Sequence, residues 1–169
     1  MDTIKDKFGV EFGKRLLRCP KDFQGEFVVP NGVTEIADFA FAECTGLTSV
    51  IIPNSVKSIG YKAFQFCSGL TSIDIPNSVT NIRKAAFALC SSLTSVTIPN
   101  SVKSIGYTVF SRCDNLTSVT LPDSIMDIGE YAFAAALKEV FVPAGQKRRF
   151  SKMKGLKNFA DIIQELSAE

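Results

Sequence analysis

Prolines recur at one fixed interval along this 169-residue chain. Five of them are 23 residues apart and a sixth follows after 21: Pro30, Pro53, Pro76, Pro99, Pro122 and Pro143. A fixed period in the twenties is typical of a solenoid, in which each repeat forms one coil. Because one coil of this length cannot bury its own apolar side chains, the coils must stack on one another. The spacing therefore predicts a single elongated domain over residues 1–169.

The same apolar pattern follows each of the first five of these prolines. Over residues 53–75 the pattern is PNSVKSIGYKAFQFCSGLTSIDI. After Leu70, Ile73 and Ile75 alternate as in a short strand with one buried face. The next proline ends the strand because it has no N–H to donate. The Val-x-x-Ile segment indicates a second extended or irregular side, and Ala-Phe-x-x-Cys has the spacing of one α-helical or 3-10 turn. We therefore expect an α/β solenoid with a parallel β-sheet on one side and short strands and helical or 3-10 turns on the others.

Phenylalanine and cysteine also keep the 23-residue period. The phenylalanines should form one internal column, made of Phe41, Phe64, Phe87, Phe110 and Phe133. The periodic cysteines are Cys44, Cys67, Cys90 and Cys113. Since they are spread along the stack and do not converge on one point, we interpret them as buried thiols rather than metal ligands or disulfide partners. Cys19 lies outside this period and is a candidate for a reactive thiol, although no histidine is present to activate it for catalysis.

The repeat resembles the BspA-type subclass of the leucine-rich-repeat superfamily. The signature that carries the resemblance is Leu-Thr-Ser-Val-x-Ile-Pro-Asn-Ser-Val-x-x-Ile-x-x-x-Ala-Phe-x-x-Cys, in five near-consecutive copies over about residues 30–143. The resemblance implies a leucine-rich-repeat solenoid of bacterial type. It also implies a non-catalytic module that binds another protein through the face of its parallel sheet, and members of this family are often secreted or exposed at the cell surface.

The outward positions of the expected strands define a sheet face. In each Leu-x-x-Val-x-Ile segment, the two side chains that alternate with the buried ones point away from the core. These partner-binding candidates are Ser49, Ile51, Ser72, Asp74, Ser95, Thr97, Ser118, Thr120, Glu139 and Phe141. The centre of this face is small and rich in hydroxyl groups. The alternative is that serine and threonine only suit exposed strand positions, because binding hot spots usually need aromatic or arginine anchors.

The segments outside residues 30–143 differ in pattern, and we expect them to close the two ends of the stack. Residues 1–29 look like a partial repeat, with short strands that end at Pro20 and Pro30. Residues 144–169 carry apolar side chains at helical spacing, interrupted by Gly155. This pattern predicts a C-terminal cap of two short helices, because the open apolar end of a solenoid needs a cover.

A basic cluster begins the C-terminal segment. Lys147, Arg148, Arg149 and Lys152 are interleaved with Phe150, a composition that suits phosphates or an anionic surface. The alternative function is therefore the binding of an anionic polymer or a membrane surface. The simpler interpretation, which we favour, is the solvated outer face of a capping helix, because most charge runs are only that.

The composition argues against an enzyme. The chain has no histidine, which removes the commonest general base and the commonest metal ligand. The sequence contains no phosphate-binding glycine loop, no Cys-x-x-Cys pair and no nucleophile elbow, so we expect no catalytic residue, no metal and no cofactor. The net charge of +2 gives no reason to expect a nucleic-acid partner, and we expect a monomer that binds a protein partner.

The sequence shows neither a signal peptide nor a transmembrane segment. Its opening, MDTIKDK, is charged and lacks the apolar run of a signal peptide, and nothing later approaches the apolar length needed to cross a bilayer. The chain as it stands is therefore expected to be cytoplasmic, whereas the family resemblance implies a secreted or cell-surface protein. Both expectations stay open at this point.

Overall fold

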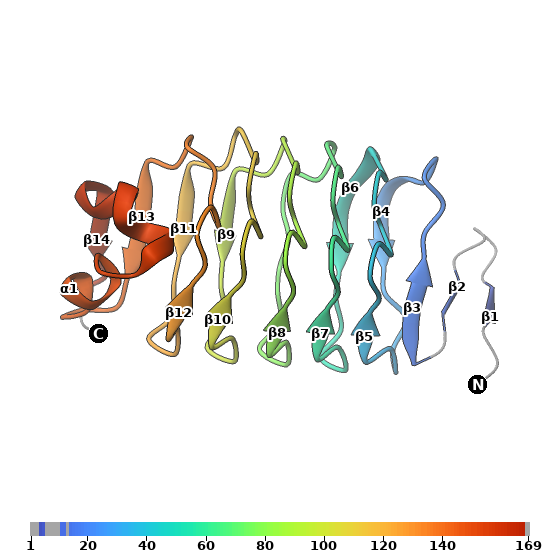
Figure 1. The fold of residues 1–169 in the computed structure, drawn as a ribbon. Helices are drawn as coiled ribbons and strands as arrows, with labels where there is room; N and C mark the ends of the chain where they lie inside the picture. Colours follow the sequence, from blue (N-terminus) through green and yellow to red (C-terminus); the bar gives the residue numbers. More distant parts are fainter. Residues whose placement is uncertain (1–3, 6–10, 13, 168–169) are drawn as a thin grey trace.

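The computed structural model describes residues 4–5, 11–12 and 14–167, with side chains from residue 14 onward. The chain winds into coils that stack along one axis, with the first strands at one end and the C-terminal helices at the other (Figure 1). Each repeat forms one coil with three sides. Two sides consist of short extended segments, and the third is a run of tight turns.

The leucine side of each coil, named for its Leu-x-x-Val-x-Ile segment, forms the predicted parallel sheet. Its strands are β4 (Gln24–Val28), β6 (Gly46–Ile51), β9 (Ser95–Thr97), β11 (Ser118–Thr120), β13 (Glu139–Val142) and β14 (Ile163–Glu165). β4 pairs with β6, and β9, β11, β13 and β14 pair in that order. Residues 70–75 separate the two groups without forming a strand, although the Thr71 N–H donates to the Thr48 carbonyl at 3.1 Å. The parallel sheet is therefore confirmed, with one interruption.

The valine side, named for its Val-x-x-Ile segment, is extended rather than irregular. Its parallel strands are β3 (Arg15–Arg18), β5 (Glu35–Ile36), β7 (Ser58–Ile59), β8 (Asn81–Ile82), β10 (Ser104–Ile105) and β12 (Asp127–Ile128). β10 and β12 pair separately from the others, and β1 (Ile4–Lys5) and β2 (Glu11–Phe12) extend the sheet beyond β3 in antiparallel fashion. The strands expected before Pro20 and Pro30 are present as β3 and β4, which lie on different sides of the solenoid.

The turn side differs from the prediction, because Ala-Phe-x-x-Cys forms consecutive tight turns instead of a helical turn. Alternate N–H groups bond within the coil, as from Ala40 to Ala37, and to the next coil, as from Phe41 to Ala63 at 2.7 Å. A helix would direct its N–H groups to carbonyls of its own segment and would leave the next coil without these bonds. The helical turns predicted for each repeat are therefore wrong, and the fold is a β-solenoid with little helix.

Up to two positions in each turn segment adopt a left-handed backbone conformation without being glycine. Their φ values lie between 54° and 65° at Phe39, Glu43, Lys62, Phe66, Ala85, Leu89, Thr108, Arg112 and Tyr131. These residues form two series, one beginning at Phe39 and one at Glu43, and each recurs every 23 residues. The fold of the coil, and not one kind of side chain, therefore determines this conformation. A left-handed conformation costs an L-residue roughly 1–2 kcal/mol. The inter-coil hydrogen bonds of the turn side offset this cost.

The predicted phenylalanine column fills the core. Successive rings of Phe41, Phe64, Phe87, Phe110 and Phe133 have centroids 4.8, 5.1, 5.3 and 5.7 Å apart, and their planes lie within 6° of parallel. These distances suit offset-stacked rings and follow the roughly 4.8 Å spacing between neighbouring strands. At the N-terminal end, Phe27 contacts Phe41 edge-to-face at 5.2 Å and ends the stack.

The C-terminal segment forms the two short helices that were predicted. α1 spans Lys147–Phe150, and η1, a 3-10 helix, spans Lys154–Ile162. Gly155 lies inside η1 and not between the helices. A Cβ at this position would collide with the Gly129 carbonyl oxygen and the Ile128 side chain, so glycine allows η1 to pack directly on the last coil. Ile163, which was expected to be helical, instead begins β14. No helix among the described residues has the length and apolar character to cross a bilayer.

We expect Phe87→Ala to lower the free energy of unfolding by about 3–5 kcal/mol, because it leaves a cavity between two stacked rings. Phe141→Ala is the matched control, since Phe141 faces outward from β13 and is only half-buried. Chemical denaturation of both variants measures the difference. Equal losses would contradict the assignment of the buried face.

We expect Thr108→Asn to raise the free energy of unfolding by about 1 kcal/mol, because asparagine tolerates the left-handed conformation better than a β-branched residue. Thr97→Asn, in the extended and exposed part of β9, should be neutral or slightly destabilising. Thermal and urea denaturation of the two variants test the prediction, and a loss of stability at residue 108 would count against it.

Candidate functional site

The predicted sheet-face residues form two rows on the leucine side. Ser95, Ser118 and Glu139 are register partners in β9, β11 and β13, and so are Thr97, Thr120 and Phe141. Ser49 and Ile51 of β6 are paired with Glu26 and Val28 of β4. Ser72 and Asp74 lie in the segment between β6 and β9. All ten side chains are exposed or half-buried, so they point outward as predicted, and their role in binding stays a proposal.

The sheet face has a hydroxyl-rich centre and apolar ends. At the N-terminal end, Val28 and Ile51 are register partners with 57% and 50% of their surface exposed. Beside them, the Ser49 hydroxyl donates to the Glu26 carboxylate at 3.1 Å. At the C-terminal end, Phe141 is half-buried in β13, next to β14. A partner would therefore find apolar contacts at both ends and small polar groups between them.

The predicted basic cluster is only partly available to a ligand. Arg149 forms an ion pair with the Asp123 carboxylate at 3.0 Å and donates to the Asp123 carbonyl. Its guanidinium carbon also lies 4.4 Å from the centre of the Phe150 ring. Arg149 therefore attaches α1 to the last coil. The remaining members, Lys147, Arg148 and Lys152, are exposed.

The cysteines form a second column beside the phenylalanines. The Sγ atoms of Cys67, Cys90 and Cys113 lie 3.0, 3.1 and 3.1 Å from the carbonyl oxygen of the phenylalanine one repeat earlier. Cys19 also belongs to this column, because the Sγ of Cys44 contacts its carbonyl oxygen at 3.8 Å. We expected Cys19 to lie outside the cysteine column, and this expectation is wrong. Cys19 stacks on Cys44 although the two are 25 residues apart and not 23.

The buried thiols are poor nucleophiles. Burial raises the pKa of Cys67, and a hydrogen bond with Cys113, together with burial, raises the pKa of Cys90. A hydrogen bond with the Cys19 side chain lowers the pKa of Cys44, but the Cys44 side chain has no exposed surface. Because the thiolate is the reactive form and needs access to its target, burial of the column disfavours reaction at these thiols.

The sequence analysis missed a row of exposed and half-buried side chains in the loops after the valine-side strands. These loops lie along the lower edge of Figure 1. We call this row the aromatic ridge, and its members are Phe39, Tyr61, Lys62, Lys84, Tyr107 and Tyr131. Phe39 contacts Tyr61, and Tyr107 contacts Tyr131, with ring centres 5.3 and 5.6 Å apart. The ammonium groups of Lys62 and Lys84 lie 5.2 Å from the rings of Tyr61 and Tyr107. The sequence signals are that Tyr61 and Tyr107 occupy the same place two repeats apart, and that Phe39 and Tyr131 occupy the next place four repeats apart.

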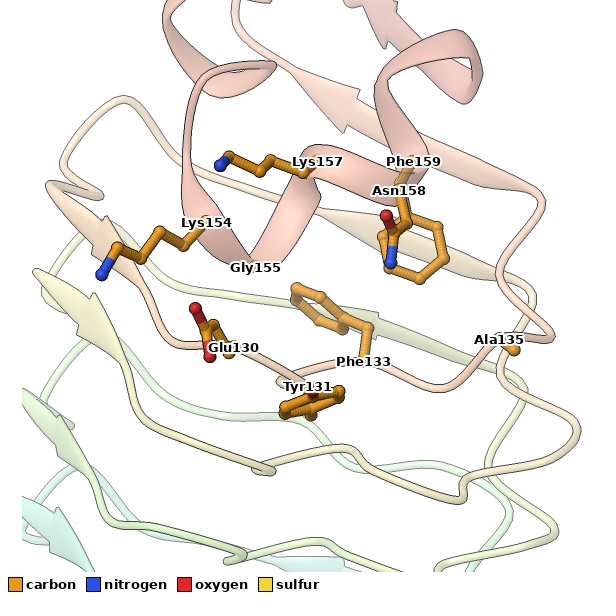
Figure 2. Close-up of a pocket in the computed structure, with 9 residues that line it drawn as sticks. All are labelled: Glu130, Tyr131, Phe133, Ala135, Lys154, Gly155, Lys157, Asn158 and Phe159. Atoms are coloured by element: carbon orange, nitrogen blue, oxygen red, sulfur yellow. The ribbon is translucent and has the colours of Figure 1, made fainter.

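A cavity of about 510 Å³ lies at the C-terminal end of the ridge, between the last coil and η1. Figure 2 shows the Phe133 ring between Tyr131 of the last coil and Phe159 of η1. Lys154, Lys157, Glu130 and Asn158 supply the polar part of the lining. The volume is within the usual range for small-molecule sites, about 300–1,000 Å³. The cavity therefore combines an apolar floor with two cationic groups.

The described residues contain no group of three or more cysteine or carboxylate side chains placed to hold a metal ion. The arrangement of the surface is suited to binding.

Comparison with known proteins identifies the repeat. Residues 21–138 match the BspA type leucine rich repeat region in six copies. The chain belongs to the BspA-type leucine-rich repeat family. Repeats of this family are generally non-catalytic. The match covers most of the chain, including the aromatic ridge and the sheet-face residues from Ser49 to Thr120.

Solved bacterial leucine-rich repeat proteins share this fold. The chain is similar to one from T. pallidum, with 38% identity and a TM-score of 0.71 over 78% of this chain and 64% of that one. It is also similar to a leucine rich cell surface protein from Faecalibacterium prausnitzii, with 32% identity and a TM-score of 0.79 over 90% and 40% of the two chains. The chain spans less than two thirds of the length of either protein. No curated protein sequence matches it significantly.

We expect the cysteines of this BspA-type repeat protein to resist alkylation in the native state. At about pH 8, iodoacetamide should modify Cys67 and Cys90 only on the timescale of unfolding, because both thiols are buried and have raised pKa values. Mass spectrometry of the peptides measures the rates, with guanidinium-unfolded protein as the control. Rapid modification of Cys90 in the native protein would contradict a closed column.

Proposed function

We propose that this chain is a non-catalytic protein-binding module whose partner lies across the sheet face. The observation that supports the proposal is the alignment of outward side chains in register across β9, β11 and β13. Parallel strands about 4.8 Å apart present these side chains at regular intervals on one surface. The small hydroxyl groups at the centre allow a partner to approach the backbone of the sheet closely.

The ends of the sheet face supply the apolar contact that its centre lacks. The exposed Val28 and Ile51 side chains lie side by side, and Phe141 lies at the opposite end. Hot spots usually combine such apolar anchors with surrounding polar contacts that exclude water. The cell-surface protein from Faecalibacterium prausnitzii, with 32% identity, is consistent with an interaction module exposed to other proteins.

The binding of an anionic polymer or membrane surface through the basic cluster is the alternative. The internal bonds of Arg149 weaken this alternative, because they leave fewer free cationic groups than the sequence suggests. Lys147, Arg148 and Lys152 remain exposed. Binding through them would fall steeply with rising salt concentration, because it would release counterions.

We expect the combined variant Ser72→Arg, Ser95→Arg, Thr97→Arg and Ser118→Arg to lose its protein partner. Burying even one unpaired guanidinium group in an interface costs several kcal/mol, so binding should weaken by at least about 30-fold. The partner is identified by affinity capture with the wild-type chain, and its affinity for each variant is then measured by biolayer interferometry.

The matched control places the same added charge on other exposed positions: Asn54→Arg, Asn77→Arg, Asn100→Arg and Ser104→Arg. This control should bind as the wild type does, and both variants should keep the wild-type thermal midpoint. Retention of the partner by a folded sheet-face variant would refute the proposal. Loss of binding only in Lys147→Glu, Arg148→Glu and Lys152→Glu would support the alternative.

A further inference from the structure

We propose that the aromatic ridge and the cavity at its C-terminal end form a second binding surface, which takes up an extended acidic segment of a protein partner. This proposal goes beyond the sheet-face function and does not depend on it. The ridge follows the valine-side strands, whereas the sheet face lies on the leucine side, so the two surfaces can be altered separately.

The ridge exposes aromatic surface that the fold itself does not need. Phe39, Tyr107 and Tyr131 are 50%, 45% and 66% exposed, although the core already holds its own aromatic column. The backbone at these positions is fixed by inter-coil hydrogen bonds, such as the one from the Phe39 N–H to the Tyr61 carbonyl at 3.0 Å. Contiguous exposed aromatic groups are typical of interaction sites, and tyrosine is enriched among binding hot spots.

The ridge has the length of a short extended peptide. From Phe39 to Tyr131 it crosses four coil intervals, which at roughly 4.8 Å each gives about 19 Å. An extended chain rises about 3.3 Å per residue, so about six residues would run along the ridge.

The two lysine ammonium groups of the ridge favour an acidic partner. None of the ion pairs between described residues includes Lys62 or Lys84, and both ammonium groups lie over tyrosine rings. The nearby Asp38 carboxylate is already engaged, because it pairs with Arg83 at 3.3 Å and accepts the Tyr61 N–H at 2.7 Å. Carboxylates of a bound segment would therefore meet lysines that are not paired with a carboxylate of the described residues.

The orientation of the rings favours a peptide over a polysaccharide. Neighbouring rings are nearly perpendicular, at 85° for Phe39 and Tyr61 and 79° for Tyr107 and Tyr131. They do not form one flat platform on which successive sugar rings could stack. Perpendicular rings leave gaps of different shape, into which the side chains of a peptide can insert.

The cavity offers a place for an apolar anchor at one end of such a segment. Tyr131 belongs to both the ridge and the cavity lining, so the two are continuous. Phe133 of the last coil and Phe159 of η1 supply the apolar part of the lining from its two sides, as Figure 2 shows, while Lys154 and Lys157 are exposed on the lining. A phenylalanine flanked by carboxylates would match this combination.

The test uses fluorescence anisotropy with labelled hexapeptides. The first probe has a phenylalanine at each end and four alternating aspartates and glutamates between them. The second replaces the acidic residues by lysine, and the third replaces the phenylalanines by serine. We expect the wild type to bind the first probe at least about tenfold more tightly than either of the others, because both charge and the apolar anchor contribute.

Two ridge variants have matched controls. Tyr131→Ser and Lys84→Glu should each weaken binding of the first probe by about tenfold. Phe66→Ser removes an equally left-handed, 47% exposed aromatic residue outside the ridge, and Lys138→Glu reverses an exposed charge elsewhere, so both should bind as the wild type does. Ile51→Ser, on the sheet face, should also leave probe binding unchanged, which separates this proposal from the first.

Three results would overturn the proposal. The first is equal binding of the acidic and basic probes by the wild type. The second is equal binding by Tyr131→Ser and Phe66→Ser in variants with wild-type thermal midpoints. The third is tighter binding of polygalacturonate than of any peptide, lost in Tyr131→Ser, which would assign the ridge to an anionic polysaccharide.

Discussion

The stacking of identical phenylalanine rings, one per coil, is the constraint on which the rest of this structure depends. Ring centres 4.8 to 5.7 Å apart fix the distance between coils at a value that also suits backbone hydrogen bonding between strands. All three sides of the coil can therefore bond to their neighbours at the same spacing. The cysteine column follows the same spacing, and the thiols of Cys67, Cys90 and Cys113 each reach a phenylalanine carbonyl of the preceding repeat. Surface side chains are aligned because these buried ones are aligned.

The sequence predicted those features that follow from strict periodicity. The 23-residue interval and the alternation in Leu-x-x-Val-x-Ile specified the stack, the parallel sheet and the core column. The turn side was mispredicted because Ala-Phe-x-x-Cys has the same apolar spacing in a helical turn and in consecutive tight turns. The left-handed residues would normally be revealed by glycine or asparagine, but here they include Phe39, Thr108 and Tyr131. Inter-coil hydrogen bonds impose that conformation, and they are invisible in one repeat taken alone.

The two candidate surfaces differed in how far the sequence could reveal them. The sheet face follows directly from alternation, so its residues were placed correctly, although the aromatic or arginine anchors expected of a hot spot are few there. The aromatic ridge was missed because its members come from two adjacent positions and change from coil to coil. Tyr61 and Lys84 occupy one position in successive repeats, and Lys62 lies at the next. Only the folded chain shows that Phe39 contacts Tyr61, and that Lys84 and Tyr131 contact Tyr107, across the coils.

At the left-handed turn position that begins with Phe39, the backbone conformation does not depend on which side chain is present. Phenylalanine, lysine, alanine, threonine and tyrosine occupy it in five successive coils with nearly the same φ, between 54° and 61°. The backbone there is held by its neighbours, so where the side chain is exposed, as at Phe39 and Tyr131, a substitution alters surface chemistry without repacking the interior. Duplication of a 23-residue unit, followed by single substitutions at this position, would then be a short evolutionary route to a new specificity. The same property makes the coil a scaffold on which an engineer could change one recognition group at a time.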